Sequence, residues 1–236
     1  MTVPTDANLA TQALTEESNY RFHAFSADDA ITLGLSIRKR FRASSRHGKG
    51  KGLVIAIQTI AGHNLFSCTV GDLGHPSGIG DVSLDSWSCL EGMINVVRRT
   101  GHSSYYVEKG MSAMGKTAKQ LGLEGDFKVQ GGAFPVWLEN APCCPIAVVA
   151  CYSGSSQDDH NLVSGTVRDY IKKLTRNSEA PGPSMPEPSI PLHRPVSEWV
   201  SELGYSNGDQ PLRHPENSVY DHHEHHGDDE HEHGRE

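Results

Sequence analysis

An Asp-Asp-His group holds the side chains of this chain that are best suited to proton transfer or metal binding. Asp158, Asp159 and His160 follow Ser156, a residue type that commonly precedes a helix. An imidazole near a carboxylate at a helix N-terminus can ligate a metal or haem iron, or act as a general base. Asp159 and His160 are therefore candidate catalytic residues. In the structural alternative, Asp159 pairs with Ser156 in an imperfect capping box, and His160 makes a hydrogen bond inside one subunit or between subunits.

A glycine-rich segment could bring the backbone close to a ligand. Gly131 and Gly132 precede Phe134 and Pro135 in the stretch Gly-Gly-Ala-Phe-Pro-Val. Because glycine has no Cβ atom, another chain or a ligand can approach its backbone amide. The same residues could instead form a bulge that turns a strand. The residues leave both interpretations open, and the four positions are candidate ligand contacts.

A second polar cluster, His102-Ser103-Ser104, follows Gly101. A Ser-His dyad requires that its two side chains meet, and neighbours at a helix start seldom point at each other. The sequence also contains no Gly-x-Ser-x-Gly nucleophile elbow. The pattern therefore favours helix capping by a serine, and His102, Ser103 and Ser104 are further candidate ligand contacts.

The last sixteen residues combine histidines with carboxylates. Residues 221–236 contain seven acidic residues, one arginine and six histidines. Imidazoles at flexible spacing, mixed with carboxylates, bind borderline divalent metals such as zinc, nickel or copper. The sequence therefore predicts weak metal association at this tail. The histidines concerned are His222, His223, His225, His226, His231 and His233.

Charge and composition exclude several classes of partner. The formal net charge is −8, and most of it lies in the acidic tail. A nucleic-acid-binding face needs clustered lysines and arginines, so we expect no nucleic-acid partner. The one basic run, residues 46–51, is interleaved with glycines, which favours a solvated connecting loop over a phosphate-binding element. No apolar run approaches the roughly 20 residues that span a bilayer, so no membrane association is expected.

The cysteine spacing and the absence of known motifs limit the cellular compartment and the kinds of reaction that we expect. The five cysteines form no paired framework and no signal peptide precedes them, which indicates a reducing compartment and a soluble, cytoplasmic protein. Dinucleotide, P-loop and zincin fingerprints are absent from the sequence. Whether the protein is an enzyme stays open.

Apolar periodicity predicts the elements that position these residues. Helices are expected where apolar residues recur every three or four positions, and strands where β-branched residues form short runs. Packed in layers, they give an α+β sandwich with a mainly antiparallel sheet of four to five strands covered by helices. The expected helices span about residues 27–42, 84–99, 105–122 and 157–174, and the expected strands about 53–60, 65–70, 127–137 and 144–152.

The two ends of the chain are expected to extend from a single domain. Residues 1–19 are predicted to be a flexible arm, and residues 20–176 the folded domain. Residues 177–236 begin with a Pro-rich stretch of low apolar content and are predicted to be disordered. Within them, a short amphipathic segment is expected to fold back, dock between subunits or bind a protein partner. Its apolar residues are Val196, Trp199, Val200 and Leu203.

In their order and approximate spacing, these motifs resemble the GlcG/HbpS-like family of haem-degrading domains, and within it a small, uncharacterised cytosolic branch. The resemblance covers roughly residues 20–175, with Glu91-Gly92-Met93 where the branch has a basic pair. The segments that carry the resemblance are Phe25–Ala30, Leu65-Phe66, Gly101–Ser104, Gly131–Val136, Ser153-Gly154 and Asp158–His160.

The resemblance implies a profilin-like fold and a homo-oligomer that binds haem, a related tetrapyrrole or another small molecule. Haem is the cofactor that it implies, in a site near Gly131–Pro135 and His160. Two other functions stay open. One is an oligomeric scaffold that presents its tails to chaperone or protein-targeting partners, and the other is a small-molecule lyase or isomerase that uses Asp159 and His160 as acid and base.

Overall fold

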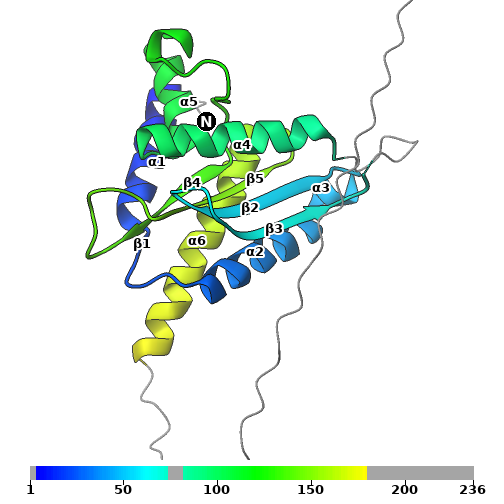
Figure 1. Cartoon of the computed structure of the whole chain (residues 1–236), viewed down its shortest axis with the longest axis vertical. Coiled ribbons are helices and arrows are strands. Elements are labelled where there is room, and N and C mark those ends of the chain that lie inside the picture. Colours follow the sequence, from blue (N-terminus) through cyan, green and yellow to red (C-terminus); the bar gives the residue numbers. More distant parts are fainter. Residues whose placement is uncertain (1–3, 74–81, 180–236) are drawn as a thin grey trace, which may run out of the picture. The chain divides into compact units, whose positions relative to one another are not determined.

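A computed structural model describes residues 4–73 and 82–179 of the chain (Figure 1). Helices and strands are mixed along the chain, with two helices between the first hairpin and the last two strands, as the sequence predicts. The elements are α1 (Asp6–Asn19), β1 (Arg21–Phe22), α2 (Ala27–Arg42), α3 (Ser45–Gly48), β2 (Leu53–Thr59), β3 (Asn64–Val70), α4 (Leu84–Thr100), α5 (Ser104–Ala113), the 3-10 helix η1 (Lys119–Leu121), β4 (Ala133–Leu138), β5 (Ala147–Tyr152) and α6 (Ser156–Glu179).

The strands form one five-stranded sheet in the order β1-β4-β5-β2-β3. All neighbouring strands pair antiparallel except the two-residue β1, which pairs parallel with β4. β2 lies between β5 and β3, and its first five residues are buried. This explains the continuous β-branched run in the sequence, because a strand covered on both faces needs apolar residues at every position. The predicted α+β fold is confirmed.

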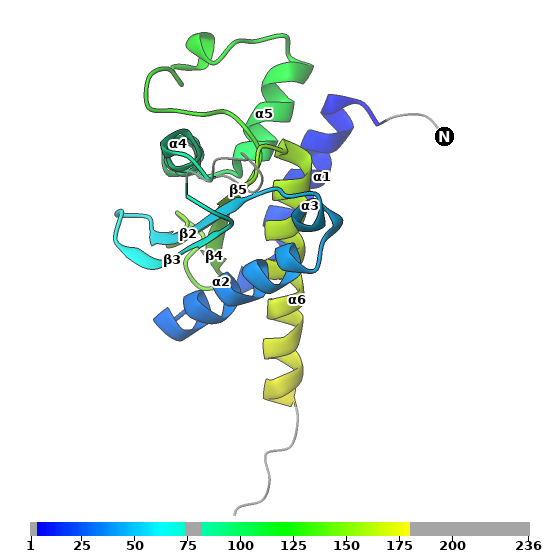
Figure 2. The same ribbon diagram turned by 90° about the vertical axis from the view of Figure 1, so that its right-hand side faces the viewer.

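Helices cover both faces of the sheet, as Figures 1 and 2 show. Helix α4 runs along one face, and α2 and α6 lie on the other. Because successive strand residues point to opposite faces, the core divides into two apolar layers. Ile55 and Val149 belong to the layer with α2 and α6, whereas Val54 and Val148 belong to the layer with α4.

Helix α2 forms where the sequence holds both a start signal and an apolar stripe. The hydroxyl of Ser26 accepts a hydrogen bond from the amide of Asp29, and the carboxylate of Asp29 accepts one from the amide of Ser26. This capping box satisfies two N–H groups that the helix leaves unpaired. The predicted stripe is buried and comprises Ala30, Leu33, Ile37 and Phe41.

The N-terminal residues differ from the flexible arm that the sequence predicts. Residues 6–19 form helix α1, which begins after the N-cap Thr5 and packs against α5. Its buried residues are Ala10, Ala13 and Glu17, so it has no stripe of large apolar side chains. The prediction of a flexible arm is therefore wrong for this helix, because contacts with distant elements hold it in place.

Several predicted boundaries differ in the structure. The strand expected over residues 144–152 spans Ala147–Tyr152, and the helix expected over residues 157–174 extends to Glu179. The helix expected over residues 105–122 ends at Ala113, close to Gly115, whose positive φ of 61° is a left-handed conformation that ends helices. The strand expected over residues 127–137 spans Ala133–Leu138, because its pairing with β5 begins at Ala133.

Several predicted features lie outside the described residues and stay predictions. They are the Pro-rich stretch, the amphipathic segment with Val196, Trp199, Val200 and Leu203, and the six tail histidines from His222 to His233. The domain boundaries likewise stay predictions. Within the described residues, no helix is long and apolar enough to cross a membrane. The same residues hold no group of three or more His, Cys, Asp or Glu side chains arranged for a metal ion.

Candidate functional site

His102 is held in place by a buried carboxylate from helix α1. Its Nδ1 atom lies 2.9 Å from Oε2 of Glu17, and the backbone amide of Ser103 donates to the other oxygen, Oε1, at 2.8 Å. An ionised carboxylate only accepts hydrogen bonds, so Nδ1 carries the proton and Nε2 keeps its lone pair in the neutral ring. The hydrogen bond to Glu17 raises the pKa of His102, and partial burial of the ring opposes this effect.

Ser103 and Ser104 make structural hydrogen bonds. Ser103 is the N-cap of α5, and its hydroxyl accepts a hydrogen bond from the amide of Tyr106. The hydroxyl of Ser104 accepts one from the amide of Ala133, which links α5 to β4. Both serines are fully buried, whereas the side chain of His102 is 42% exposed. Of the three candidate ligand contacts, His102 is therefore the one available to a ligand.

An apolar groove of about 310 Å³ opens beside His102, between the end of α4, helix α5 and the residues after α5. The imidazole of His102 and the ring of Tyr106 lie with their centroids 4.8 Å apart, and Arg99 also lines the groove. The groove thus combines an oriented imidazole and one cation with an apolar wall. The apolar side chains of that wall are Val107, Met111, Met114, Leu121 and Leu123.

The glycine-rich segment before β4 packs against the protein's own chain. A Cβ atom on Gly131 would lie 2.6 Å from the carbonyl oxygen of Ser156, and one on Gly132 would collide with the carbonyl of Cys151. The amide of Gly131 donates to the carboxylate of Glu108 at 2.7 Å and to the hydroxyl of Ser156 at 2.9 Å. The glycines therefore allow β4 to approach β5 and α6. The other two candidates of this segment, Phe134 and Pro135, are buried in β4.

Asp159 forms a buried ion pair that joins three segments. Its Oδ1 accepts hydrogen bonds from Nη1 of Arg46 at 2.7 Å and from the hydroxyl of Ser153 at 2.6 Å. Its Oδ2 accepts a third, of 2.7 Å, from the amide of Ser153. Burial raises the pKa of Asp159, an effect that the hydrogen bonds from Ser153 and Arg46 oppose. These contacts occupy the carboxylate on both oxygens.

His160 contacts different partners from those of Asp159. Its ring stacks on Tyr105 with centroids 4.4 Å apart, and its Nε2 lies 3.3 Å from Oε2 of Glu16. Burial acts to raise the pKa of Glu16, yet contacts with His160 and Gln12 hold it below its ordinary value. Nδ1 of His160 and the hydroxyl of Tyr105 are buried with no hydrogen-bond partner among the described residues. The structure therefore does not bring Asp159 and His160 together as an acid-base pair.

Sequence reasoning missed Glu17 and Arg46, the charged partners of two candidate residues. Glu17 lies 85 positions from His102, and Arg46 lies 113 positions from Asp159. No local spacing connects residues so far apart. For Glu17 a signal was available in Thr5-Asp6, because threonine before an acidic first turn is a common helix start.

Comparison with known proteins identifies the family. The family described as haem degrading protein HbpS-like matches residues 25–168, more than half of the chain. The protein belongs to this HbpS-like family. The resemblance predicted from the motifs is thus confirmed. The HbpS-like region contains His102, Asp159 and His160, whereas Glu17 precedes it in α1.

The HbpS-like chain is 28% identical to a UPF0303 protein of Edwardsiella ictaluri over 158 residues, which are 66% of this chain and 90% of that protein. It is 31% identical to a UPF0303 protein of Rhizobium etli over 164 residues, 69% of this chain and 88% of that one. Among solved structures, the Ybr137w protein superposes with a TM-score of 0.60 at 20% identity, over 74% of this chain and 91% of the other. This last likeness supports the fold alone.

Proposed function

We propose that the protein binds haem or a related tetrapyrrole in the groove beside His102. The pairing of His102 with Glu17 is the observation that carries the proposal. Metal-ligating histidines commonly donate their second ring N–H to a carboxylate, which fixes the tautomer and makes the free nitrogen more basic. Nδ1 of His102 has this partner at 2.9 Å, and the ring borders the groove. Membership of a family described as haem-degrading adds support.

The residues of the groove fit such a group. Histidine is a common protein ligand of haem iron, and His102 would provide it through Nε2. Apolar side chains such as Val107 and Leu123 would cover the macrocycle, and Arg99 would pair with a propionate. The volume of about 310 Å³ is at the lower end of the roughly 300–1,000 Å³ of small-molecule pockets, so the groove would enclose part of a tetrapyrrole. Bound haem would supply iron redox or oxygen chemistry.

A haem titration followed by absorbance tests the proposal on the full chain. The six tail histidines are first replaced by asparagine, because they could bind haem themselves. We expect this background variant to give a Soret shift that saturates at one haem per chain. In the same background, His102→Ala is expected to weaken binding by at least about tenfold, and Glu17→Gln by about tenfold, the usual effect of losing the carboxylate partner of a metal-bound histidine.

His63→Ala is the matched control, because His63 is exposed in the turn between β2 and β3. It is expected to leave the haem affinity unchanged. Equal binding by the His102→Ala and His63→Ala variants would contradict the proposed site. Loss of all binding with the tail histidines would contradict haem binding by the folded domain.

The remaining predictions require separate experiments. Native mass spectrometry measures the predicted homo-oligomer. The scaffold function depends on Val196, Trp199, Val200 and Leu203, which lie outside the described residues, and a tail-dependent pull-down tests it. The lyase or isomerase function requires Asp159 and His160 to act as an acid-base pair, and the different partners of these two side chains do not favour it.

A further inference from the structure

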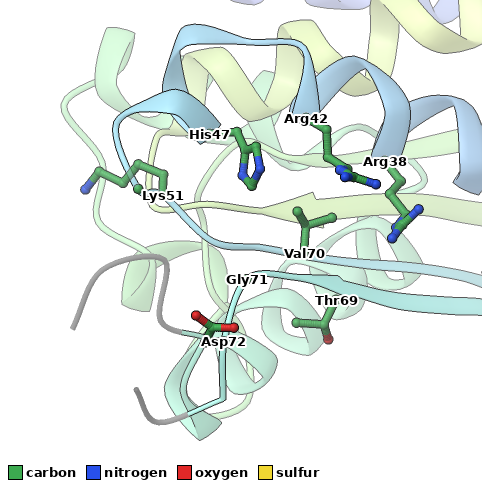
Figure 3. A pocket seen from close by; sticks show the side chains of 9 residues that line it. Arg38, Arg42, His47, Lys51, Thr69, Val70, Gly71 and Asp72 are labelled. Carbon is green, nitrogen blue, oxygen red and sulfur yellow. The ribbon is translucent and has the colours of Figure 1, made fainter. Parts of the chain in front are cut away.

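A second cavity, of about 470 Å³, lies where the end of α2, the turn around α3 and the end of β3 meet (Figure 3). Four basic side chains line it: Arg38 and Arg42 from α2, His47 from α3, and Lys51 from the residues before β2. Asp72, just after β3, is the one carboxylate among its described lining residues. The cavity shares no lining residue with the groove beside His102.

The two guanidinium groups have no carboxylate partner within the described residues. Arg38 and Arg42 lie one turn apart on α2, and Figure 3 shows both side chains extending toward the end of β3. Arg40 on the same helix is, by contrast, paired with Asp169 at 2.7 Å. Like charges four residues apart destabilise a helix. The helix dipole favours cations in the last turn, which accounts for Arg42 but not for Arg38. A bound anion would account for both.

The wall that carries His47 is fixed by the buried pair of Arg46 and Asp159. Nη1 of Arg46 lies 2.7 Å from Oδ1 of Asp159, and its guanidinium lies 5.1 Å from the ring centroid of Phe41. The ring of His47 lies 5.9 Å from that of Phe41, and its Nδ1 is buried with no hydrogen-bond partner in the described part of the chain. The wall is therefore held in position before any ligand arrives.

We propose that this pocket binds a small polyanion that carries phosphate or carboxylate groups. The planar fork of an arginine binds either group through two parallel hydrogen bonds, and Arg38 and Arg42 provide two such forks. The volume suits a metabolite-sized ligand. In Figure 3 the amine of Lys51 points away from the guanidinium groups, so Lys51 lies at the rim and attracts anions from solution. The basic run of residues 46–51 thus contributes to an anion site.

Isothermal titration calorimetry of the full chain tests this proposal, with pyrophosphate and citrate as probes of the two chemistries. Arg38→Gln and Arg42→Gln are each expected to weaken binding of the preferred probe by about tenfold, the effect of losing one charge-assisted contact. Lys39→Gln is the matched control, because it removes one positive charge from the same helix outside the pocket. It is expected to change the dissociation constant by less than about twofold.

Asp72→Asn provides a result that misfolding cannot imitate. Loss of this carboxylate removes a repulsion of the anion, so binding is expected to become several-fold tighter. Tighter binding of pyrophosphate than of citrate would assign phosphate groups to the natural ligand, and the reverse would assign carboxylates. The proposal is overturned if neither probe binds the wild-type chain at millimolar concentration. It is also overturned if Lys39→Gln weakens binding as much as Arg42→Gln, or if Asp72→Asn does not tighten it.

Discussion

In the His102–Glu17 pair, each side chain depends on the other. His102 hydrogen-bonds to the buried carboxylate of Glu17, and this contact orients the imidazole ring. The side chain of Glu17 is 4% exposed, and burial of a carboxylate is costly unless the group is paired or hydrogen-bonded. The ring of His102 and the amide of Ser103 provide these partners. In return, Glu17 fixes which nitrogen of His102 carries the proton. A candidate ligand atom is thus positioned from a helix that precedes the HbpS-like region.

The effect of Glu17 on the pKa of His102 can be measured by NMR titration of the imidazole ring. The hydrogen bond to Glu17 raises the pKa of His102 above its ordinary value of about 6.5. Because the folded-state pKa is raised, the pair contributes fully to stability below the unfolded pKa and loses its contribution as the pH rises through the folded value. We expect Glu17→Gln to lower the pKa of His102.

Glu16→Gln is the matched control for that titration, since Glu16 lies on the same helix but contacts His160. It is expected to leave the His102 curve in place. If Glu16→Gln and Glu17→Gln shift the curve equally, the overall charge of α1 acts on His102 and the specific hydrogen bond does not.

Elements with local signals could be predicted from the sequence, and elements held by distant contacts could not. Helix α2 has a capping box and an apolar stripe, and both signals lie within its own residues. Helix α1 has a start signal in Thr5-Asp6, but it buries only Ala10, Ala13 and Glu17 and has no stripe of large apolar side chains, so its packing against α5 and its contact with His102 could not be predicted. The glycines before β4 signalled a close approach, but the partner, the carbonyl of Cys151, comes from folding.

The hydrogen bond between Tyr170 on α6 and Asp29 on α2 predicts how the stability of the fold changes at low pH. The hydroxyl of Tyr170 donates to Oδ1 of Asp29 at 2.6 Å, and burial together with this bond raises the pKa of Tyr170 to about 12. Burial acts to raise the pKa of Asp29, but the bonds from Tyr170 and Ser26 hold it below its ordinary value. A lowered pKa stabilises the fold above the unfolded value of about 4, and this contribution is lost as the pH falls through the folded value.

Asp29→Asn is therefore expected to cost about 1–2 kcal/mol of the free energy of unfolding at pH 7. The difference from wild type should narrow as the pH falls below about 4. Urea unfolding of the wild type and the variant at several pH values measures this difference in the free energy of unfolding. Asp28→Asn is the control, because it removes an exposed charge from the same first turn. A cost that stays constant with pH would show that the charge of Asp29 does not stabilise the connection.

Across the whole molecule, Asp159 connects segments that are distant in the sequence. It joins Arg46 in α3 to Ser153 after β5 and to the first turn of α6. An ion pair in the interior adds little to the free energy of unfolding compared with apolar packing. Removal of one partner is nevertheless costly, because it leaves a buried charge uncompensated. Because Asp159 is fully buried and bonded on both oxygens, we interpret it as a residue that stabilises the fold.

Asp159→Asn separates this interpretation from a catalytic one. The substitution keeps the shape of the side chain but leaves the guanidinium of Arg46, which is 19% exposed, without its counter-charge. We expect it to lower the free energy of unfolding by about 3 kcal/mol. Asp158→Asn, which removes an exposed charge from the same turn, should cost less than about 1 kcal/mol. Denaturant unfolding of both variants measures the difference. If the two costs are equal, the ion pair of Asp159 with Arg46 does not stabilise the fold, and this interpretation is wrong.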